Sequence, residues 1–551
     1  MSSQPSGARD RPVVYTILPG ERLPPGGADE VGNKAWNLMR MAEAGLPVPA
    51  AFVLPAIWSR GSRAPKEGVT ALAAALTEGI TRIELATGLA FGSPRKPLLV
   101  SVRSGAAVSM PGMMETVLDV GLNDETVEGL IRLTGNPRLA WDSYRRLIQG
   151  FAEVVQGLPT GPFDALVQEA LVLEGEVSER MLDHCSLRRL VRSMLDRFQE
   201  LAGIPFPQTP VDQLTRTTDA VFRSWDAPKA AEYRLLNHIS DDIGTAVTVQ
   251  TMVFGNAGGT SGAGVGFTRD PATGENVLYL DFQFNGQGED VVAGRVALQD
   301  TELLRATLPA IWDRLQDIRQ QLEAMFGDVQ DFEFTVQDGQ LHLLQTRRAK
   351  RTPWAALKIA VDLVEEGLIK PKEALKQIKS IDLDAVALGR LSGTQDAPLT
   401  RATVAGIGVV AGRIAFDTTA AKRLADSGDP AVLIRRETTT GDIAGMVNAA
   451  GILTALGGRT SHAAVVARQL GKVCLVGCTD LSIDLQARTC RLGQSSFAEG
   501  DWLTLDGNSG AVLAGRREVI MERPEHALAS IKRWTESESA GASPPVAASV
   551  P

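Results

Sequence analysis

One stretch, 457–468, constrains this chain most, and it reads Gly-Gly-Arg-Thr-Ser-His-Ala-Ala-Val-Val-Ala-Arg. A strand-like apolar run, 451–456, leads into the two glycines, and the residues after His462 favour a helix. Thr460 or Ser461 can cap that helix, so we expect His462 at or near its N-terminus. Free N–H groups and the helix dipole favour negative charge there and keep an imidazole neutral and nucleophilic. The pattern therefore predicts a histidine that attacks phosphorus and then holds the phosphoryl group.

A core histidine beside a glycine turn is the ordinary alternative, but the glycines, the cap and the Ala-rich helix together favour a phosphocarrier. The segment 457–471 resembles the phosphohistidine motif of the phosphoenolpyruvate-utilising enzymes. These include pyruvate phosphate dikinase, phosphoenolpyruvate synthase and the sugar-transport Enzyme I. The resemblance implies that His462 is the phosphorylated residue. It also implies that Thr460 matches a position phosphorylated by regulatory kinases in some dikinases, although we favour helix capping as its role here.

Composition limits the classes of function. The 551 residues suggest two to four domains, and the net charge of -9 provides no basic surface for nucleic acid or acidic lipid. No stretch is long and apolar enough to span a bilayer and the N-terminus lacks an apolar signal core, so we expect a cytoplasmic protein. Four cysteines form no disulfide framework, and we interpret Cys474 and Cys478 as buried thiols rather than zinc ligands.

Two basic residues in the first third of the chain are candidates for binding phosphate. Lys34 stands at the start of a predicted helix that Gly45 and Pro47 end, and it is either a solvated surface lysine or a phosphate-binding charge. Arg103 follows a short apolar strand and precedes a loop rich in small residues and methionine. An arginine at such a position usually has an anionic partner. We therefore expect a loop that closes over a nucleotide.

A glycine-rich segment, 255–270, follows a β-branched strand at 246–254 and includes Gly258 and Gly262. Such a segment suits a hairpin loop lying over phosphates, although flexible turns have a similar composition. It contains neither a Walker motif nor a Rossmann fingerprint. Further along, Glu289 lies in a second glycine-bearing segment and could add an acidic contact.

Paired carboxylates mark a predicted hairpin around Asp338. Asp331 and Glu333 alternate with phenylalanines, so both carboxylates lie on one face of a strand, and Gln345 and Arg347 share a face of the returning strand. The ordinary alternative is an exposed charged strand. Two adjacent carboxylates repel each other unless a cation separates them, and Mg²⁺ prefers one or two carboxylates together with phosphate oxygens. Arg347 could neutralise the charge of a transferred phosphoryl group.

The stretches 98–118, 247–294 and 329–350 resemble the ATP-grasp nucleotide-binding domain of pyruvate phosphate dikinase. By this resemblance Lys34 and Arg103 contact the polyphosphate, and Asp331 and Glu333 lie at the Mg²⁺–phosphate end. Gln345 and Arg347 then lie near the transferred group. The adenine rests near Met252 and Val253.

We expect a mixed α/β (α+β) chain with an ATP-grasp domain and a swivelling β/α phosphohistidine domain. The expected parts are a disordered N-terminus over 1–13, the ATP-grasp domain over 14–348 with a helical insert at about 120–240, a helical linker over 349–397, the carrier domain over 398–515, and a weak helix with a disordered tail over 516–551. A carrier that visits two separated sites needs such a linker as a hinge.

The resemblance implies that the β-phosphoryl group of ATP passes to His462 while phosphate takes the γ group, which yields AMP and pyrophosphate. The full dikinase continues into a (β/α)₈ barrel that binds phosphoenolpyruvate and pyruvate, and the resemblance here ends before that barrel. Three hypotheses stay open: a split dikinase with a separate barrel subunit, the same ATP-to-histidine chemistry with another acceptor, and a non-catalytic nucleotide-binding or phosphocarrier module. Assembly into a homo-oligomer also stays open.

Overall fold

The computed structural model describes residues 14–21, 23–61, 67–108, 110, 114–288, 301–393, 397–459 and 461–541. The side chains of residues 60, 61, 67–69, 440, 462 and 539–541 also lie outside that description. The predicted disordered N-terminus, 1–13, and the end of the predicted tail, 542–551, are outside the described residues. The chain divides into two compact units, Met1–Ala257 with Thr335–Arg347, and Gly258–Phe334 with Arg348–Pro551.

An antiparallel five-stranded sheet forms the centre of the first unit. Its order is β1 (Tyr15–Ile17), β2 (Ala51–Leu54), β7 (Ala246–Thr251), β5 (Val100–Gly105) and β6 (Thr116–Val120). Alternation along the strands directs Val102 and Val249 into the main apolar core. The same alternation leaves Ser101, Arg103 and Thr248 on the opposite face. The helix α1 (Gly27–Glu43) packs against β5 and β7.

Helices make up the segment between β6 and β7, as the sequence predicted for residues 120–240. They are α4 (Thr126–Thr134), α5 (Pro137–Val154), α6 (Gly161–Glu174), α7 (His184–Ala202), α8 (Pro210–Arg223) and α9 (Pro228–Leu236). The helix α3 (Glu67–Thr87) joins them on the apolar side of the sheet. Asp142 and Arg145 of α5 are buried as an ion pair.

The second unit begins with strands β8 (Gly262–Phe267) and β9 (Tyr279–Phe284), which pair antiparallel. The helices α11 (Thr301–Thr307) and α12 (Pro309–Phe326) follow. The predicted hairpin is present as β10 (Gln330–Gln337) and β11 (Gln340–Arg348), and β10 neighbours β8. Residues Thr335–Arg347 of this hairpin are assigned to the first unit, and the rest of β10 and β11 to the second.

The structure corrects our interpretation of Gly262 as part of a phosphate-covering loop. Gly262 is the first residue of the buried strand β8, and a Cβ atom there would collide with the ring of Phe282. A Cβ atom at Gly264 would likewise collide with the ring of Phe334, and one at Gly266 with the ring of Phe332. These glycines therefore serve the packing of aromatic rings on a sheet, and only the turn before β8, which includes Gly258, has the character of an open loop.

We expect Gly264→Ala to lower the free energy of unfolding by about 1–3 kcal/mol, because overpacking forces shifts in the backbone. The added Cβ atom would lie 2.5 Å from Cζ of Phe334 and 2.8 Å from the Asp281 carbonyl oxygen. Gly150→Ala is the matched control, since Gly150 lies inside helix α5 with no atom within 4 Å of the new Cβ. The control should raise stability by up to about 1 kcal/mol. Urea unfolding measures both, and equal effects would contradict the packing argument.

An eight-stranded mixed sheet forms the core of the region that the sequence assigned to the carrier domain. Its order is β13 (Thr400–Arg401), β23 (Ala511–Ala514), β22 (Trp502–Asp506), β15 (Val409–Ala415), β16 (Ala431–Arg435), β17 (Gly451–Thr454), β18 (Val473–Val476) and β14 (Thr403–Gly406). The strands β15 to β18 run parallel. The helices α15 (Thr418–Asp426), α16 (Ile443–Asn448) and α17 (His462–Leu470) pack around it.

The predicted strand at 451–456 is present as β17, but sequence reasoning did not identify two features of this region. One is β18, which is fully buried and contains Cys474. The other is a separate three-stranded sheet of β19 (Leu481–Asp484), β20 (Thr489–Leu492) and β21 (Ser495–Ala498). Cys474 and Cys478 are buried thiols, as expected, and burial raises the pKa of Cys474 to about 12.

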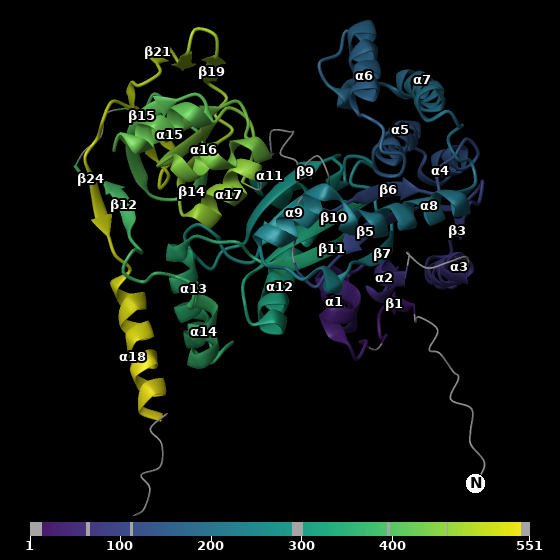
Figure 1. Ribbon diagram of the computed structural model, residues 1–551, viewed down its shortest axis with the longest axis horizontal. Helices are drawn as coiled ribbons and strands as arrows, with labels where there is room; N and C mark the ends of the chain where they lie inside the picture. Colours follow the sequence, from purple (N-terminus) through teal and green to yellow (C-terminus); the bar gives the residue numbers. More distant parts are fainter. Residues whose placement is uncertain are drawn as a thin grey trace, which may run out of the picture. The chain divides into compact units, whose positions relative to one another are not determined.

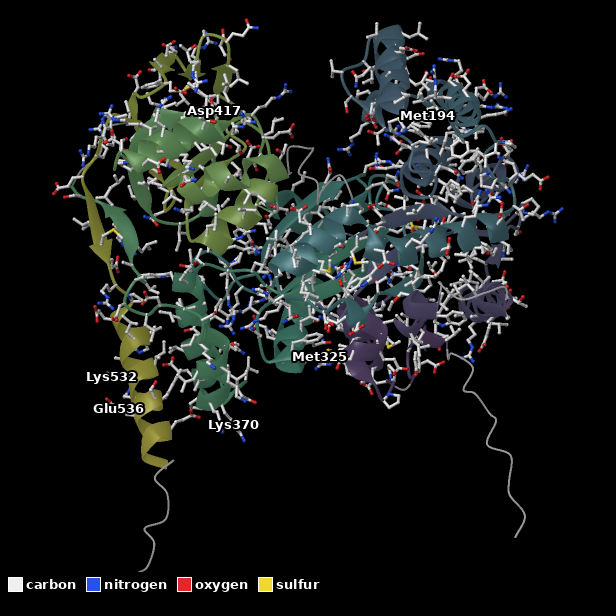
Figure 2. The ribbon with its side chains drawn as sticks, in the orientation of Figure 1. Met194, Met325, Lys370, Asp417, Lys532 and Glu536 are labelled. Carbon is white, nitrogen blue, oxygen red and sulfur yellow. The ribbon has the colours of Figure 1, made fainter. Side chains whose placement is uncertain are left out.

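The predicted linker helices are present as α13 (Pro353–Glu365) and α14 (Pro371–Ile378). The helix at the C-terminus is α18 (Glu525–Gly541), and it buries Ala527 and Ile531 in one apolar cluster with α13 and α14. The strands β12 (Leu388–Leu391) and β24 (Val519–Glu522) pair antiparallel beside these helices (Figure 1). Figure 2 places the exposed Lys532 and Glu536 on the outward side of α18. The sequence predicted only a weak helix within 516–551, whereas α18 is held by the packing of Ala527 and Ile531 against α13 and α14.

No helix among the described residues combines the length and apolarity that crossing a membrane requires.

Candidate functional site

The helix α17 begins at His462, as the sequence predicted. The side chain of Ser461 caps it by accepting a hydrogen bond from Ala464 N at 3.5 Å. Gly457 has a φ of 101°, which allows the chain to turn between β17 and the helix. Gly471 ends α17 in a left-handed conformation. His462 is therefore the first residue of a capped helix, while its side chain and Thr460 lie outside the described part of the chain.

The helix segment that carries Lys34 and the end of the strand that carries Arg103 approach each other closely through their backbones. Gly32 kinks α1 with a φ of 78°, and a Cβ atom there would collide with the Gly105 carbonyl. Asn33 N donates a hydrogen bond to Ala106 O at 3.0 Å. Lys34 therefore lies at the start of the helical segment that follows the kink, beside the end of β5, as predicted.

Arg103 is half-buried on the polar face of the five-stranded sheet. Its guanidinium makes no hydrogen bond or ion pair with another described residue. Thr248 stands directly opposite in the strand register, is 2 % exposed, and its Oγ1 has no hydrogen-bond partner among the described residues. A half-buried cation beside an unsatisfied hydroxyl is suited to a bound anion.

Gln345 and Arg347 belong to the same unit. Asn37 of α1 donates a hydrogen bond from Nδ2 to the carbonyl oxygen of Thr346 at 2.9 Å. This bond joins the helix that carries Lys34 to the part of β11 between the two predicted residues. Gln345 is buried and Arg347 is exposed. The first unit thus brings four predicted phosphate-binding residues onto connected elements.

The residues predicted to border the adenine directly follow β7. Met252 and Val253 are both half-buried, and Met252 N donates to Leu99 O at 2.9 Å. Gly258 comes next, in a turn with a φ of 147°. Their contact with a nucleotide stays a prediction, and Glu289 lies outside the described residues.

Asp331 and Glu333 lie on β10 in the second unit. Thr268 N donates to Gln330 O at 2.9 Å, and the rings of Phe332 and Phe334 occupy the space over Gly266 and Gly264. This register places Phe267 opposite Asp331 and Val265 opposite Glu333. Since residues that face each other across an antiparallel pair share one side of the sheet, both carboxylates lie on the side away from the phenylalanines, as predicted.

Both carboxylates are partly or fully removed from solvent, with Asp331 5 % exposed and Glu333 half-buried. Asp281 of β9 lies on the same side, opposite Val265. Among the described residues, no three His, Cys, Asp or Glu side chains converge on one point. A Mg²⁺ ion held by Asp331 and Glu333 would therefore take its other oxygens from a nucleotide or water, which is the coordination that Mg²⁺ favours.

Sequence reasoning missed two arginines within the histidine motif itself. The guanidinium of Arg459 lies over the ring of Tyr279, 4.6 Å from its centroid. That of Arg468 lies over the ring of Phe267 at 5.3 Å. Both arginines were visible in the sequence, but nothing in their spacing indicated aromatic partners almost two hundred residues away.

Two regions of the chain match known protein families. Residues 69–314 match a family model described as the pyruvate phosphate dikinase AMP/ATP-binding domain, and residues 428–510 match the mobile domain of PEP-utilising enzymes. The chain is 42% identical over 522 residues to a pyruvate, phosphate dikinase of Clostridium symbiosum, covering 92% of this chain and 58% of that protein. It is 41% identical over 533 residues to the Rhizobium meliloti protein, again with 92% and 58% covered. The chain thus spans a little over half the length of these relatives.

Proposed function

Since the chain carries the AMP/ATP-binding and mobile-domain regions of the pyruvate phosphate dikinase family, we propose that it transfers the β-phosphoryl group of ATP to His462. In this reaction an imidazole nitrogen of His462 forms the new bond to the β phosphorus, and the bond between the α and β phosphates breaks to release AMP. The bond between the β and γ phosphates then breaks as inorganic phosphate takes the γ group and leaves as pyrophosphate, which keeps the β-phosphoryl group on the histidine. The observation that carries the proposal is the start of α17 at His462, behind a glycine turn and a serine cap.

The basic residues of the first unit would bind the polyphosphate. Lys34 supplies a point charge beside the end of β5, and Arg103 supplies a planar fork on the neighbouring sheet face. Gln345 and Arg347 would lie near the transferred group, where positive charge offsets the charge of the transition state.

Mg²⁺ fits the donor set of the second unit. Asp331 and Glu333 share one side of β10, and the repulsion between two carboxylates is relieved by a divalent cation. When bound, Mg²⁺ would neutralise charge on the phosphate oxygens. The two carboxylates would orient it from one side of the sheet.

Phosphohistidine then requires an acceptor. We propose that a separate barrel subunit delivers the group to pyruvate and so forms phosphoenolpyruvate, because relatives named pyruvate, phosphate dikinase are about 40% identical over 92% of this chain. The same ATP-to-histidine chemistry with another acceptor is the alternative. A cytoplasmic location, where ATP and phosphate are abundant, belongs to the proposal as well.

ATP labelled separately at the β and γ phosphates tests the proposal. The chain is incubated with each label and Mg²⁺, with and without inorganic phosphate, and acid-labile, base-stable label is counted on the protein. With phosphate present, label from the β position alone supports the proposed half-reaction, and added barrel protein with pyruvate should then remove it. Without phosphate the γ group has no acceptor, so label from both positions on the protein also fits the proposal. Label from the γ position alone would mean a simple kinase transfer. Absence of both labels, despite ATP binding, would contradict a phosphocarrier.

Arg103→Ala should weaken ATP binding by about 10- to 100-fold, because a charge-assisted hydrogen bond contributes about 1.5–3 kcal/mol. The replacement should leave the fold intact, because the guanidinium of Arg103 makes no hydrogen bond or ion pair with another described residue. Isothermal titration with ATP measures the affinity, and the thermal midpoint checks the fold.

Arg132→Ala is the matched control for Arg103, because Arg132 is an exposed arginine at the C-terminal end of helix α4 in the same unit. Its replacement should leave ATP affinity unchanged. Arg103→Lys keeps the charge but loses the planar fork, so it should fall between wild type and alanine. Unaltered affinity in Arg103→Ala would remove this residue from the proposed nucleotide site.

A further inference from the structure

The second unit contains an arginine–aromatic contact that joins the phosphohistidine region to strands β8 and β9. Arg459 lies over Tyr279 and Arg468 lies over Phe267, while the two rings meet edge to face with centroids 6.0 Å apart. The hydroxyl of Tyr279 donates to the carbonyl oxygen of Val404 in β14 at 3.1 Å. Residues on both sides of His462 in sequence thus contact the same pair of rings.

The arginine–aromatic contact is partly buried, since one of its two arginines is inaccessible to solvent. Arg468 is 0 % exposed, and its Nη1 donates to Arg459 O at 2.8 Å, which ties α17 to the loop before it. Its Nε and Nη2 have no hydrogen-bond partner among the described residues. Its Nη1 also donates to Ala405 O at 3.5 Å, and the ring of Phe267 adds a cation–π contact to this buried charge. Burial also raises the pKa of Tyr279, so its hydroxyl remains a donor at neutral pH.

The two rings lie on the side of the sheet that carries the acidic pair. Phe267 pairs with Tyr279 in the β8–β9 register and stands opposite Asp331 in β10. Directly opposed residues in antiparallel strands have Cβ atoms about 4.5–5.5 Å apart. The arginines of the carrier therefore contact the same sheet side as Asp331 and Glu333, rather than the side filled by Phe332 and Phe334.

We propose that Arg459 and Arg468 are positioning residues that hold the phosphohistidine helix on the acidic side of the β8–β10 sheet during phosphoryl transfer from ATP. The inference rests on the proposed function for its catalytic meaning, but the contact itself does not. Neither arginine touches the reacting atoms in this role. They act by holding the carrier in one position. The rate of phosphoryl transfer to His462 should therefore depend on them, whereas the affinity for ATP should not.

Arg459→Ala tests the proposal in the full chain. Loss of a desolvated cation–π contact should raise amide hydrogen exchange in residues 403–406 and 267–280 about tenfold, without ATP present. The rate of labelling of His462 from ATP should fall about tenfold while the KM for ATP stays the same. Arg459→Lys should recover part of both effects, because an ammonium group also binds an aromatic face. Arg468→Lys repeats the test at the buried position, with a thermal midpoint to check folding.

Arg516→Ala is the matched control. Arg516 is exposed and lies 4.8 Å from the Trp502 centroid, so it makes an arginine–aromatic contact away from Tyr279 and Phe267. This variant should change neither exchange nor labelling. Unchanged exchange in a folded Arg459→Ala would overturn the contact, and increased exchange with a wild-type labelling rate would overturn the positioning role. If the wild-type chain takes no label at all, the proposed function fails, and hydrogen exchange still decides whether the contact exists.

Discussion

His462→Ala should reduce the acid-labile, base-stable label from ATP to background, a loss of at least about 10⁴-fold in labelling rate. The imidazole at the start of α17 is the only nucleophile in the proposed transfer, and alanine at the first helical position is tolerated well. ATP affinity should change little, because the polyphosphate is bound by other residues. Labelling with ATP carrying a β-phosphate isotope, together with calorimetric ATP binding, separates the two effects.

His526→Ala provides the control for His462→Ala. His526 lies in α18 and its side chain is 77% exposed. Its replacement should leave both labelling and ATP binding as in wild type. Full labelling of His462→Ala would assign the phosphoryl group to another residue and end the carrier proposal. Equal loss in both variants would point to a general defect in folding, which the thermal midpoint reveals.

Arg269→Met should lower the free energy of unfolding by about 3–5 kcal/mol, the range found when one partner of a buried ion pair is removed. Arg269 is 0 % exposed and lies just after β8. Its Nη2 contacts Glu323 of α12 at 2.8 Å, and its Nη1 donates to Glu366, the C-cap of α13, at 3.0 Å. Methionine leaves the nearly buried Glu323 without its cation.

Urea unfolding measures the effect of Arg269→Met, with Arg82→Ala as its control. Arg82 pairs with Glu78 at 2.9 Å, but both side chains are about half exposed, at 46% and 54%. Losing such a surface pair costs about 0.5 kcal/mol or less. Similar losses in the two variants would show that the buried network contributes no more than a surface pair. The linker helix α13 should also become more sensitive to protease in Arg269→Met, because its C-terminal anchor is Glu366.

The contacts of α13 bear on the hinge that the sequence predicts within the linker, which remains a prediction. Arg269 binds the C-terminal end of α13, and Thr352 at its N-terminal end donates from Oγ1 to Ala272 O at 2.7 Å. The helix α18 shares one apolar cluster with α13 and α14. A swivelling motion would therefore concentrate in the residues between α14 and the carrier sheet, where β12 and β24 pair as a two-stranded ribbon.

The amino-acid sequence by itself predicted the elements that depend on residues close together in the chain. The glycine turn, the serine cap and the start of α17 at His462 follow from backbone freedom, side-chain hydrogen bonding and helix propensity within a dozen residues. The alternation of Asp331 and Glu333 with phenylalanines defined a strand and its two faces in the same way. Lys34 was a candidate because it stands at the start of a predicted helix, and Arg103 because it lies where a strand opens into a loop of small residues. Their nucleotide contacts remain predictions.

Only the tertiary structure decided which distant residues meet. The glycines of β8 looked like a phosphate loop in the sequence, yet they make room for Phe282, Phe332 and Phe334, because a ring from a neighbouring strand leaves no local trace at the glycine. Arg459 and Arg468 were read as part of a histidine motif, but their aromatic partners depend on how β8 and β9 pack. Helix caps and strand alternation depend on residues that are neighbours in the sequence. The close approach of two backbones and the burial of a charged side chain depend on contacts between residues far apart in the sequence.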